Sequence, residues 1–186
     1  MTIRSVIGDA TRPSTEKNAI IAHVVNTVGA WGSGFVIAVS KRWQEPEAAY
    51  RLWAKSKSPD FRLGAAQLVQ VEGDVWVANM IAQNGINRRK DGSPPWDAVG
   101  LERCLFNVAL AATHLDAEVH LPRICCARGG AKWFEIEPII QKTLGDLDVT
   151  TVVYDYPGDK PICPECFDRR AVYSANDELV ACPVCS

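Results

Sequence analysis

The sequence predicts a three-layer α/β/α fold with a mixed β-sheet, followed by a small cysteine-rich tail. Short apolar runs rich in β-branched residues alternate with longer segments of helical period. Strands separated by helices usually form a mostly parallel sheet with helices on both faces. The stretch Tyr-Pro-Gly-Asp-Lys-Pro at residues 156–161 stops regular structure, and two Cys-x-x-Cys pairs follow it. We therefore expect one domain over residues 1–157 and a second, smaller one over residues 158–186.

The expected strands are the apolar runs, most of which are rich in β-branched residues. They are Thr2–Ile7, Ala19–Val25, Ala66–Val71, Val75–Ile81, Glu118–Leu121 and Val149–Tyr154. Between the third and the fourth lies Glu-Gly-Asp at residues 72–74, which is turn chemistry and predicts an antiparallel hairpin. The others are separated by helical segments, so they are expected to pair in parallel.

The expected helices are Gly34–Arg42, Pro46–Ser56, Pro95–Leu115 and Phe134–Leu144. In the third, apolar residues recur every three or four positions and form one buried stripe: Leu101, Leu105, Val108, Ala112 and Leu115. In the fourth, Glu135 and Glu137 with Pro138 close behind suit the start of a helix, because acids and proline are favoured in the first turn.

The composition indicates which classes of protein the chain can belong to. With 186 residues, of which 47% are hydrophobic and 23% charged, the chain can bury a sizeable core without disulfides. The formal net charge is −2, so there is no electrostatic reason to expect tight binding to a duplex phosphate backbone. Neither a signal peptide nor a run long enough to span a membrane is evident. We expect a soluble, cytoplasmic protein that contacts no membrane.

Two glycine-containing loops each follow an expected strand and precede an expected helix. The first is Asn-Thr-Val-Gly-Ala-Trp-Gly-Ser at residues 26–33, and the second is Pro-Arg-Ile-Cys-Cys-Ala-Arg-Gly-Gly-Ala-Lys-Trp at residues 122–133. Unpaired amides and the positive end of a helix dipole collect at such places, so a phosphate is favoured. For one loop alone, a tight turn with close helix packing explains the glycines equally well. Two loops together could hold a diphosphate from both sides.

Five segments together resemble the macro domain, in order and over roughly residues 1–157. They are VIGDAT, IIAHVVNTVGAWGSGFVIAVSKRW, LGAAQLVQVEGDVWVANMIAQNGI, LPRICCARGGAKW and TVVYDY. Within that family the chain looks most like the branch of terminal ADP-ribose protein glycohydrolases and ADP-ribose-1″-phosphate phosphatases. The H-x-x-N-x-x-G-x-W-G-x-G spacing that begins at His23 is similar to that of the phosphatases.

The resemblance implies a cleft for ADP-ribose at the carboxyl ends of the strands. Asp9 would accept a hydrogen bond from the adenine amino group, Tyr154 would stack on the ring, and the two loops would hold the diphosphate. Without the family, Asp9 is better explained as a turn residue and Tyr154 as a core aromatic. The implied ligand-binding residues are Gly8, Asp9, Ala10, Asn26, Gly29, Ala30, Trp31, Gly32, Ser33, Gly34, Phe35, Pro122, Arg123, Ile124, Cys126, Ala127, Arg128, Gly129, Gly130 and Tyr154.

The distal ribose would then face Asn26 and His23. Where one branch of the family carries a lysine nucleophile this sequence has Gln83, and where an acid is expected in the second loop it has Gly129. Either catalysis would depend on Asn26, His23 and Gln83 with a bound water, or the domain would bind ADP-ribose without cleaving it. His23 lies in an apolar strand, where a buried structural histidine is the commoner case.

Other reactive or charged side chains have plainer explanations. Cys125 and Cys126 precede a helix and would be nucleophilic as thiolates, but their apolar setting favours packing, as it does for Cys104. His114 and His120 are interpreted as structural or surface residues. The basic run at residues 88–90 would approach the ligand from a loop or form a solvated turn.

The tail carries a metal-binding pattern. Two Cys-x-x-Cys turns separated by 15 residues let four thiolates surround one ion, and closed sites of this kind usually hold structural zinc. The expected ligands are Cys163, Cys166, Cys182 and Cys185, with a short hairpin between the pairs, as in the zinc ribbons that the segment resembles. The tail would dock to a protein or nucleic acid, or only cap the domain.

Three functions follow from these interpretations. The first is an ADP-ribosyl hydrolase that removes ADP-ribose from modified protein or nucleic acid. The second is a phosphatase acting on ADP-ribose-1″-phosphate. The third is a non-catalytic reader that binds ADP-ribose while the ribbon recruits a partner. None of them needs a catalytic cofactor, and zinc would be structural.

Overall fold

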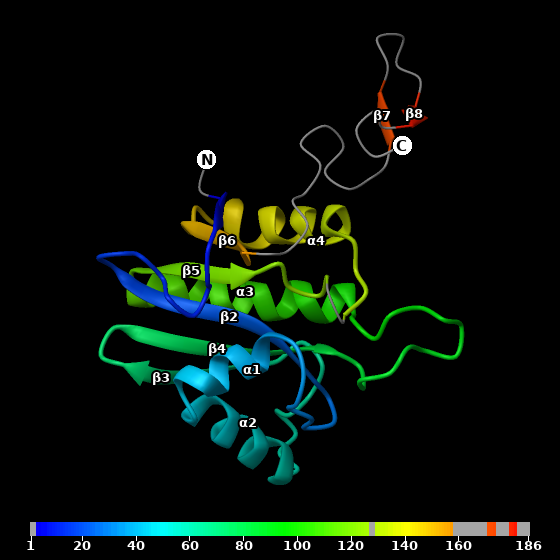
Figure 1. Ribbon diagram of the computed structural model, residues 1–186. Coiled ribbons are helices and arrows are strands. Elements are labelled where there is room, and N and C mark those ends of the chain that lie inside the picture. The colour runs from blue at the N-terminus through cyan, green and yellow to red at the C-terminus, as the bar shows by residue number, and fades with distance from the viewer. Residues whose placement is uncertain (1–2, 127–128, 158–170, 174–178, 182–186) are drawn as a thin grey trace.

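The computed structural model describes residues 3–126, 129–157, 171–173 and 179–181 (Figure 1). Its centre is a six-stranded mixed sheet in the order β1-β6-β5-β2-β4-β3. These strands are β1 (Ile3–Ile7), β2 (Asn18–Asn26), β3 (Ala66–Glu72), β4 (Val75–Gln83), β5 (Ala117–Pro122) and β6 (Thr151–Asp155). Neighbouring strands run parallel, except that β3 and β4 form the expected antiparallel hairpin.

Helices cover both faces of the sheet, which confirms the predicted three layers (Figure 1). On one face lie α1 (Phe35–Arg42) and α2 (Glu45–Lys55), which pack on alternate residues of β2 and β4 such as Ile21 and Val77. On the other face lie α3 (Ala98–Leu115) and α4 (Trp133–Ile140), followed by a π-helical turn, η1 (Gln141–Gly145). The predicted stripe of α3 is buried, with Leu101, Leu105 and Val108 fully inaccessible.

Several predicted boundaries were wrong, and β4 is one of them, since it continues past the predicted Ile81 to Gln83. Helix α3 begins at Ala98 instead of Pro95, because the Asp97 carboxylate caps the helix by accepting a hydrogen bond from Gly100 N at 2.8 Å. Strand β6 begins at Thr151, after a residue of left-handed backbone at Asp148 (φ 57°). Helix α4 has only Glu135 in its first turn, so Glu137 and Pro138 lie farther along the helix, and the segment expected to remain α-helical to Leu144 ends in the π turn.

The expected hairpin of the tail is present as β7 (Ala171–Tyr173) and β8 (Leu179–Ala181), which pair antiparallel. The four predicted zinc ligands lie outside the described residues. Within those residues, no helix is both long enough and apolar enough to cross a membrane.

The topology gathers loops at one edge of the sheet. Strands β1, β2, β4, β5 and β6 run in the same direction, so the segments that follow them lie side by side at their carboxyl ends. The two glycine loops are the connections from β2 to α1 and from β5 to α4.

Candidate functional site

A cleft of about 1020 Å³ opens at the carboxyl ends of the parallel strands. Its walls include residues 26 and 30–33 of the first loop, residues 122–126 and 129 of the second loop, and the start of α1. Most of the predicted site residues line it: Gly8, Ala10, His23, Asn26, Ala30, Trp31, Gly32, Ser33, Gly34, Phe35, Gln83, Pro122, Arg123, Ile124, Cys126, Gly129 and Tyr154. The structure thus brings both loops to one cavity.

Three predicted ligand-binding residues lie off the cleft wall: Asp9, Gly29 and Gly130. The Asp9 carboxylate accepts hydrogen bonds from Thr11 N (2.9 Å) and Thr11 Oγ1 (2.8 Å), which is the geometry of a turn-stabilising residue. Gly130 of the second loop lies next to Pro94 and Arg88. Ala127 and Arg128 lie outside the described residues.

Asn26 shapes the first loop. Its Oδ1 accepts hydrogen bonds from Val28 N (3.1 Å) and Ala30 N (3.0 Å), and its Nδ2 donates to Ala30 O (2.7 Å). The hydroxyl of Tyr50 in α2 donates to Asn26 O and accepts from Asn26 N at 3.2 Å. Burial raises the pKa of Tyr50 to about 12, so this hydroxyl stays protonated. Only one Nδ2 hydrogen of Asn26 is left for a ligand or a water.

The rest of the first loop is tied to α1 and α2. Trp31 Nε1 donates to Ser40 Oγ at 2.7 Å, and Arg51 Nη2 donates to Trp31 O at 3.0 Å. Gly29 has a left-handed φ of 72°, and a β-carbon there would lie 2.8 Å from that of Ala54. The loop therefore has a fixed shape before any ligand arrives.

His23 lies beneath the first loop, with only 1% of its surface exposed. Asn79 Nδ2 donates to Pro46 O (3.0 Å), which leaves Asn79 Oδ1 to accept from His23 Nε2 at 2.7 Å. The ring meets Trp31 edge to face at 5.3 Å, and burial lowers its pKa to about 4. Its Nδ1 is buried without a partner among the described residues. We assign His23 to packing rather than to proton transfer.

Gln83 ends β4 directly beside Asn26, its partner in the sheet register. Its main-chain oxygen accepts a hydrogen bond from Thr27 N at 3.0 Å. The half-buried carboxamide lines the cleft and makes no hydrogen bond to another described residue. A donor and an acceptor are thus both available beside Asn26.

The second loop is closed by backbone contacts and one ion pair. Ala131 N donates to Cys125 O at 3.0 Å, and a β-carbon at Gly129 would lie 2.2 Å from that oxygen, so no larger residue fits. Arg123 pairs through two nitrogens with Asp155, and its guanidinium lies 4.7 Å from the ring centre of Trp133. Its Nη1 is buried without a hydrogen-bond partner among the described residues.

A chain of polar groups stands behind Tyr154, close to the second loop. The Tyr154 hydroxyl lies 3.0 Å from His120 Nδ1, and His120 Nε2 lies 3.7 Å from Glu118 Oε2. Burial lowers the pKa of His120 to about 4, so the imidazole is neutral near pH 7. The arrangement fits a tautomer in which Nδ1 accepts from Tyr154 and Nε2–H points to Glu118. This fixes the tyrosine ring at the cleft.

The cysteines of the folded domain suit packing. Burial raises the pKa of the Cys125 thiol, and it raises that of Cys104 to about 12. Neither is a thiolate near neutral pH, so we assign no nucleophile to them. Among the described residues that line the cleft there is neither a lysine nor a carboxylate, and Arg123 is the one permanent cation.

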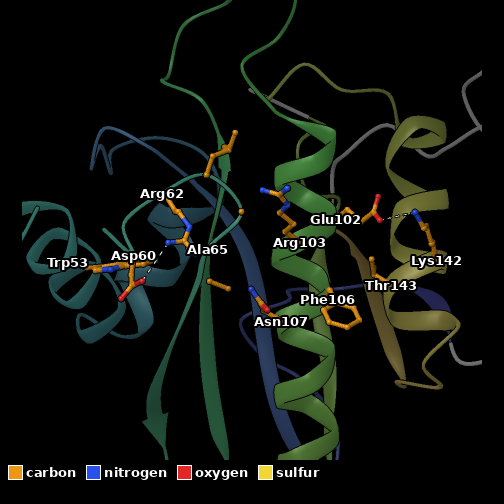
Figure 2. Close-up of a pocket in the computed structure, with 13 residues that line it drawn as sticks. Trp53, Asp60, Arg62, Ala65, Glu102, Arg103, Phe106, Asn107, Lys142 and Thr143 are labelled. Carbon is orange, nitrogen blue, oxygen red and sulfur yellow. Dashed lines mark hydrogen bonds and ion pairs between the residues drawn. The ribbon is translucent and has the colours of Figure 1, made fainter. Parts of the chain in front are cut away.

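A second cavity, of about 730 Å³, lies beside the solvent-facing side of α3 (Figure 2). Its charged side chains pair mostly with one another: Lys142 with Glu102 at 2.7 Å, and Arg62 with Asp60 at 3.7 Å. It contains neither glycine loop, so the cleft is the better candidate site. No cluster of three or more metal-ligating side chains occurs within the described residues.

Sequence reasoning missed several residues of the site. Tyr50 and Arg51 were seen only as part of a helix, and their hydrogen bonds to the first loop carry no sequence signal. Eight further residues of the described part of the chain line the cleft: Val24, Val25, Val36, Ala38, Ile86, Pro95, Cys125 and Tyr156. Ile86 and Tyr156 were recoverable in principle, because each follows a strand that ends at the same edge of the sheet.

No protein-family model matches the sequence. Among curated proteins, the mouse chromodomain-helicase-DNA-binding protein 1-like is 33% identical over 167 residues, which cover 85% of this chain. The chain spans only 18% of that relative's length.

Two solved structures are similar to this chain. A macrodomain protein from Streptomyces coelicolor is 47% identical, with a TM-score of 0.73, over 82% of this chain and 98% of that one. Thermosipho africanus DarTG in complex with ADP-ribose shares the fold, with 18% identity and a TM-score of 0.64 over 80% of this chain and 40% of that one.

Proposed function

This chain belongs to the macrodomain family, and from that premise we propose that its cleft binds ADP-ribose and that the protein hydrolyses the bond between ADP-ribose and a modified macromolecule. The main support for the proposal is that two glycine loops line the same cleft. The Gln83 carboxamide also lines it and makes no hydrogen bond to another described residue. The DarTG structure in complex with ADP-ribose supports the choice of ligand, because the 40% of that chain which this one matches has the same fold.

The diphosphate would lie between the two loops. The first amides of α1 have no partner within the helix, and Gly34, Phe35 and Val36 line the cleft at that point. On the opposite wall lies Arg123, whose guanidinium shares its charge with Asp155 and whose Nη1 is buried without a hydrogen-bond partner among the described residues. Backbone amides on one side and a held guanidinium on the other suit a doubly charged diphosphate.

Adenine and the distal ribose would then lie at opposite ends of the cleft. Adenine would lie near Gly8 and the ring of Tyr154, which the His120 contact holds in place. The distal ribose would lie beside Asn26 and Gln83, which are neighbours in the sheet register.

The chemistry would use neutral groups. The Gln83 carboxamide and the remaining Nδ2–H of Asn26 would orient a water on the anomeric carbon of the distal ribose. The water oxygen forms the new bond, the bond from that carbon to the macromolecule breaks with its electron pair leaving on the macromolecule, and the water proton passes to solvent. None of the described residues that line the cleft is a lysine, so the proposed step forms no covalent lysine intermediate.

A second candidate function is a reader that binds ADP-ribose without cleaving it. One observation favours it: no described residue of the cleft is a carboxylate or lysine that would act as base or nucleophile. The reader and the hydrolase share the same binding mode and differ only in turnover.

The test is to incubate the protein with three substrates: a carboxylate-linked ADP-ribosylated protein, ADP-ribosylated DNA and ADP-ribose-1″-phosphate. The hydrolase predicts release of ADP-ribose from a macromolecule, at least about tenfold slower in Gln83→Ala, with ADP-ribose affinity changed by less than about threefold. Binding without turnover of any substrate supports the reader. Release of phosphate alone supports the phosphatase.

We also propose that Cys163, Cys166, Cys182 and Cys185 hold one structural zinc ion through their thiolates. The antiparallel pair β7–β8 lies between the two Cys-x-x-Cys turns, as the ribbon interpretation requires. Protein purified without chelator should contain one zinc per chain, and Cys163→Ser together with Cys182→Ser should lose it. A metal-free wild-type chain would overturn the assignment.

A further inference from the structure

The connection from β4 to α3, residues 84–97, projects beyond the sheet edge on which the cleft opens (Figure 1). We call it the β4–α3 loop. Ile86 and Pro95 line the cleft, and Gly130 of the second loop packs against the other side of the connection. A β-carbon at Gly130 would lie 3.2 Å from Pro94 Cβ and 3.4 Å from Arg88 Nη2. Gln83 directly precedes this loop, so with the distal ribose placed beside Gln83 as proposed, a macromolecule attached to that ribose would leave the cleft next to the loop.

Hydrogen bonds within the β4–α3 loop hold its shape. Arg89 N donates to Ser93 O at 2.9 Å, and Gly92 N donates to Arg89 O at 3.0 Å. The Asp91 carboxylate accepts from Ser93 N (2.9 Å) and Ser93 Oγ (2.6 Å). At the base, Asn84 N donates to Pro95 O at 2.9 Å. A tip ordered in this way presents its side chains without a large loss of backbone entropy on binding.

Two cations of the tip are not neutralised. Arg89 is used internally, since its Nη2 lies 3.5 Å from Asp97 Oδ2 and donates to Trp96 O at 3.1 Å. Arg88 donates to Gly92 O at 2.8 Å but forms no ion pair with a described residue, and neither does Lys90. Both are exposed. Ile86 adds an apolar side chain, 58% exposed, between them and the cleft.

We propose that the β4–α3 loop is a docking surface for an acidic peptide segment that flanks the ADP-ribosylated side chain of a protein substrate. The inference rests on the proposed function and names its substrate class. Arg88 and Lys90 would pair with carboxylates on the segment, and Ile86 would contact its apolar parts.

An acidic peptide fits better than nucleic acid for two reasons. The chain carries a net charge of −2, which gives no general attraction to a phosphate backbone. The one aromatic residue of the β4–α3 loop, Trp96, is partly buried and packs against the core, so the loop presents no exposed ring on which an unpaired base would stack. Two cations beside one exposed apolar residue match a short acidic segment with a hydrophobic neighbour.

The experiment compares peptides that carry one ADP-ribose through a non-hydrolysable linkage, flanked either by Asp and Glu or by Asn and Gln. For Arg88→Gln combined with Lys90→Gln, the Kd for the acidic peptide should rise about fivefold, from two exposed ion pairs. The Kd for the neutral peptide and for free ADP-ribose should change by less than twofold. Arg62→Gln, another exposed arginine outside the cleft, is the matched control and should change none of the three values.

Two results would overturn the inference. One is an equal loss of affinity for the acidic and the neutral peptide, or no loss for either. The other is a larger loss for an oligonucleotide carrying ADP-ribose than for the acidic peptide, which would make nucleic acid the partner. Failure of the wild-type chain to bind free ADP-ribose would instead overturn the proposed function, and this inference with it.

Discussion

The first and second loops face the same cleft but are stabilised by different interactions. The first is held chiefly by neutral hydrogen bonds from two buried side chains, Asn26 and the Tyr50 hydroxyl, with one further hydrogen bond from the cation Arg51. The second is held by a tight backbone closure at Gly129 and by the ion pair of Arg123 with Asp155. Loss of a buried hydrogen-bonded group leaves partners unsatisfied, whereas a partly exposed ion pair is screened by salt. The two loops should therefore fail under different conditions.

Acid is expected to have the largest effect, and it should weaken both sides of the cleft. His23 lies beneath the first loop and His120 beside the second, and burial lowers the pKa of each from 6.5 to about 4. In the unfolded chain they bind protons near pH 6.5, while the folded chain resists protonation until about pH 4. Stability should therefore fall as pH drops from about 6.5 to 4, by about 3 kcal/mol for each histidine.

Urea unfolding at several pH values measures this slope. His120→Asn keeps an acceptor for the Tyr154 hydroxyl without titrating, so its slope should be smaller by one proton between pH 6.5 and 5. Stability that is equal at pH 7 and pH 5 would contradict the burial of neutral imidazoles.

Asn26→Ala should break the first loop alone. The change leaves Val28 N, Ala30 N and Ala30 O without their partner, so unfolding free energy should fall by about 2–3 kcal/mol. ADP-ribose affinity should fall at least about 30-fold, because the amides lose their arrangement. Calorimetry would measure the affinity and urea unfolding the stability. A variant with wild-type values for both would show that the loop does not depend on this side chain.

Removing the ion pair should weaken the second loop by a smaller amount. A double-mutant cycle with Arg123→Gln and Asp155→Asn should give a coupling energy of about 1–2 kcal/mol, since the pair is bidentate and only partly exposed. Raising salt from about 0.05 to 0.5 M should reduce that coupling, while the effect of Asn26→Ala should stay constant. If the coupling energy and the effect of Asn26→Ala changed equally with salt, the two loops would not differ in the interactions that stabilise them.

The sequence was sufficient for the fold because its periodicities are clear. Alternation of β-branched runs with helical stripes predicted the strand and helix order, and Glu-Gly-Asp predicted the β3–β4 hairpin. The errors arose where a local interaction decides a boundary. Because Asp97 caps α3, the helix begins at Ala98, three residues after the predicted start at Pro95. No sequence pattern predicted the π turn after Ile140.

The sequence predicted where the site lies, but it did not predict the role of each side chain in it. The carboxyl ends of parallel strands identify the edge, so both loops were predicted to meet there. What Asn26 and His23 do depends on how many of their hydrogen bonds are already used, and that depends on partners such as Tyr50 and Asn79. These partners come from distant parts of the chain, so a linear pattern does not reveal them.

The crystal structure of this chain with ADP-ribose would test the central claim most directly. We expect the diphosphate oxygens to lie about 3 Å from amides of the first loop and from groups of the second loop at the same time. A diphosphate held by one loop only, or a nucleotide bound in the cavity beside Arg103, would contradict the account.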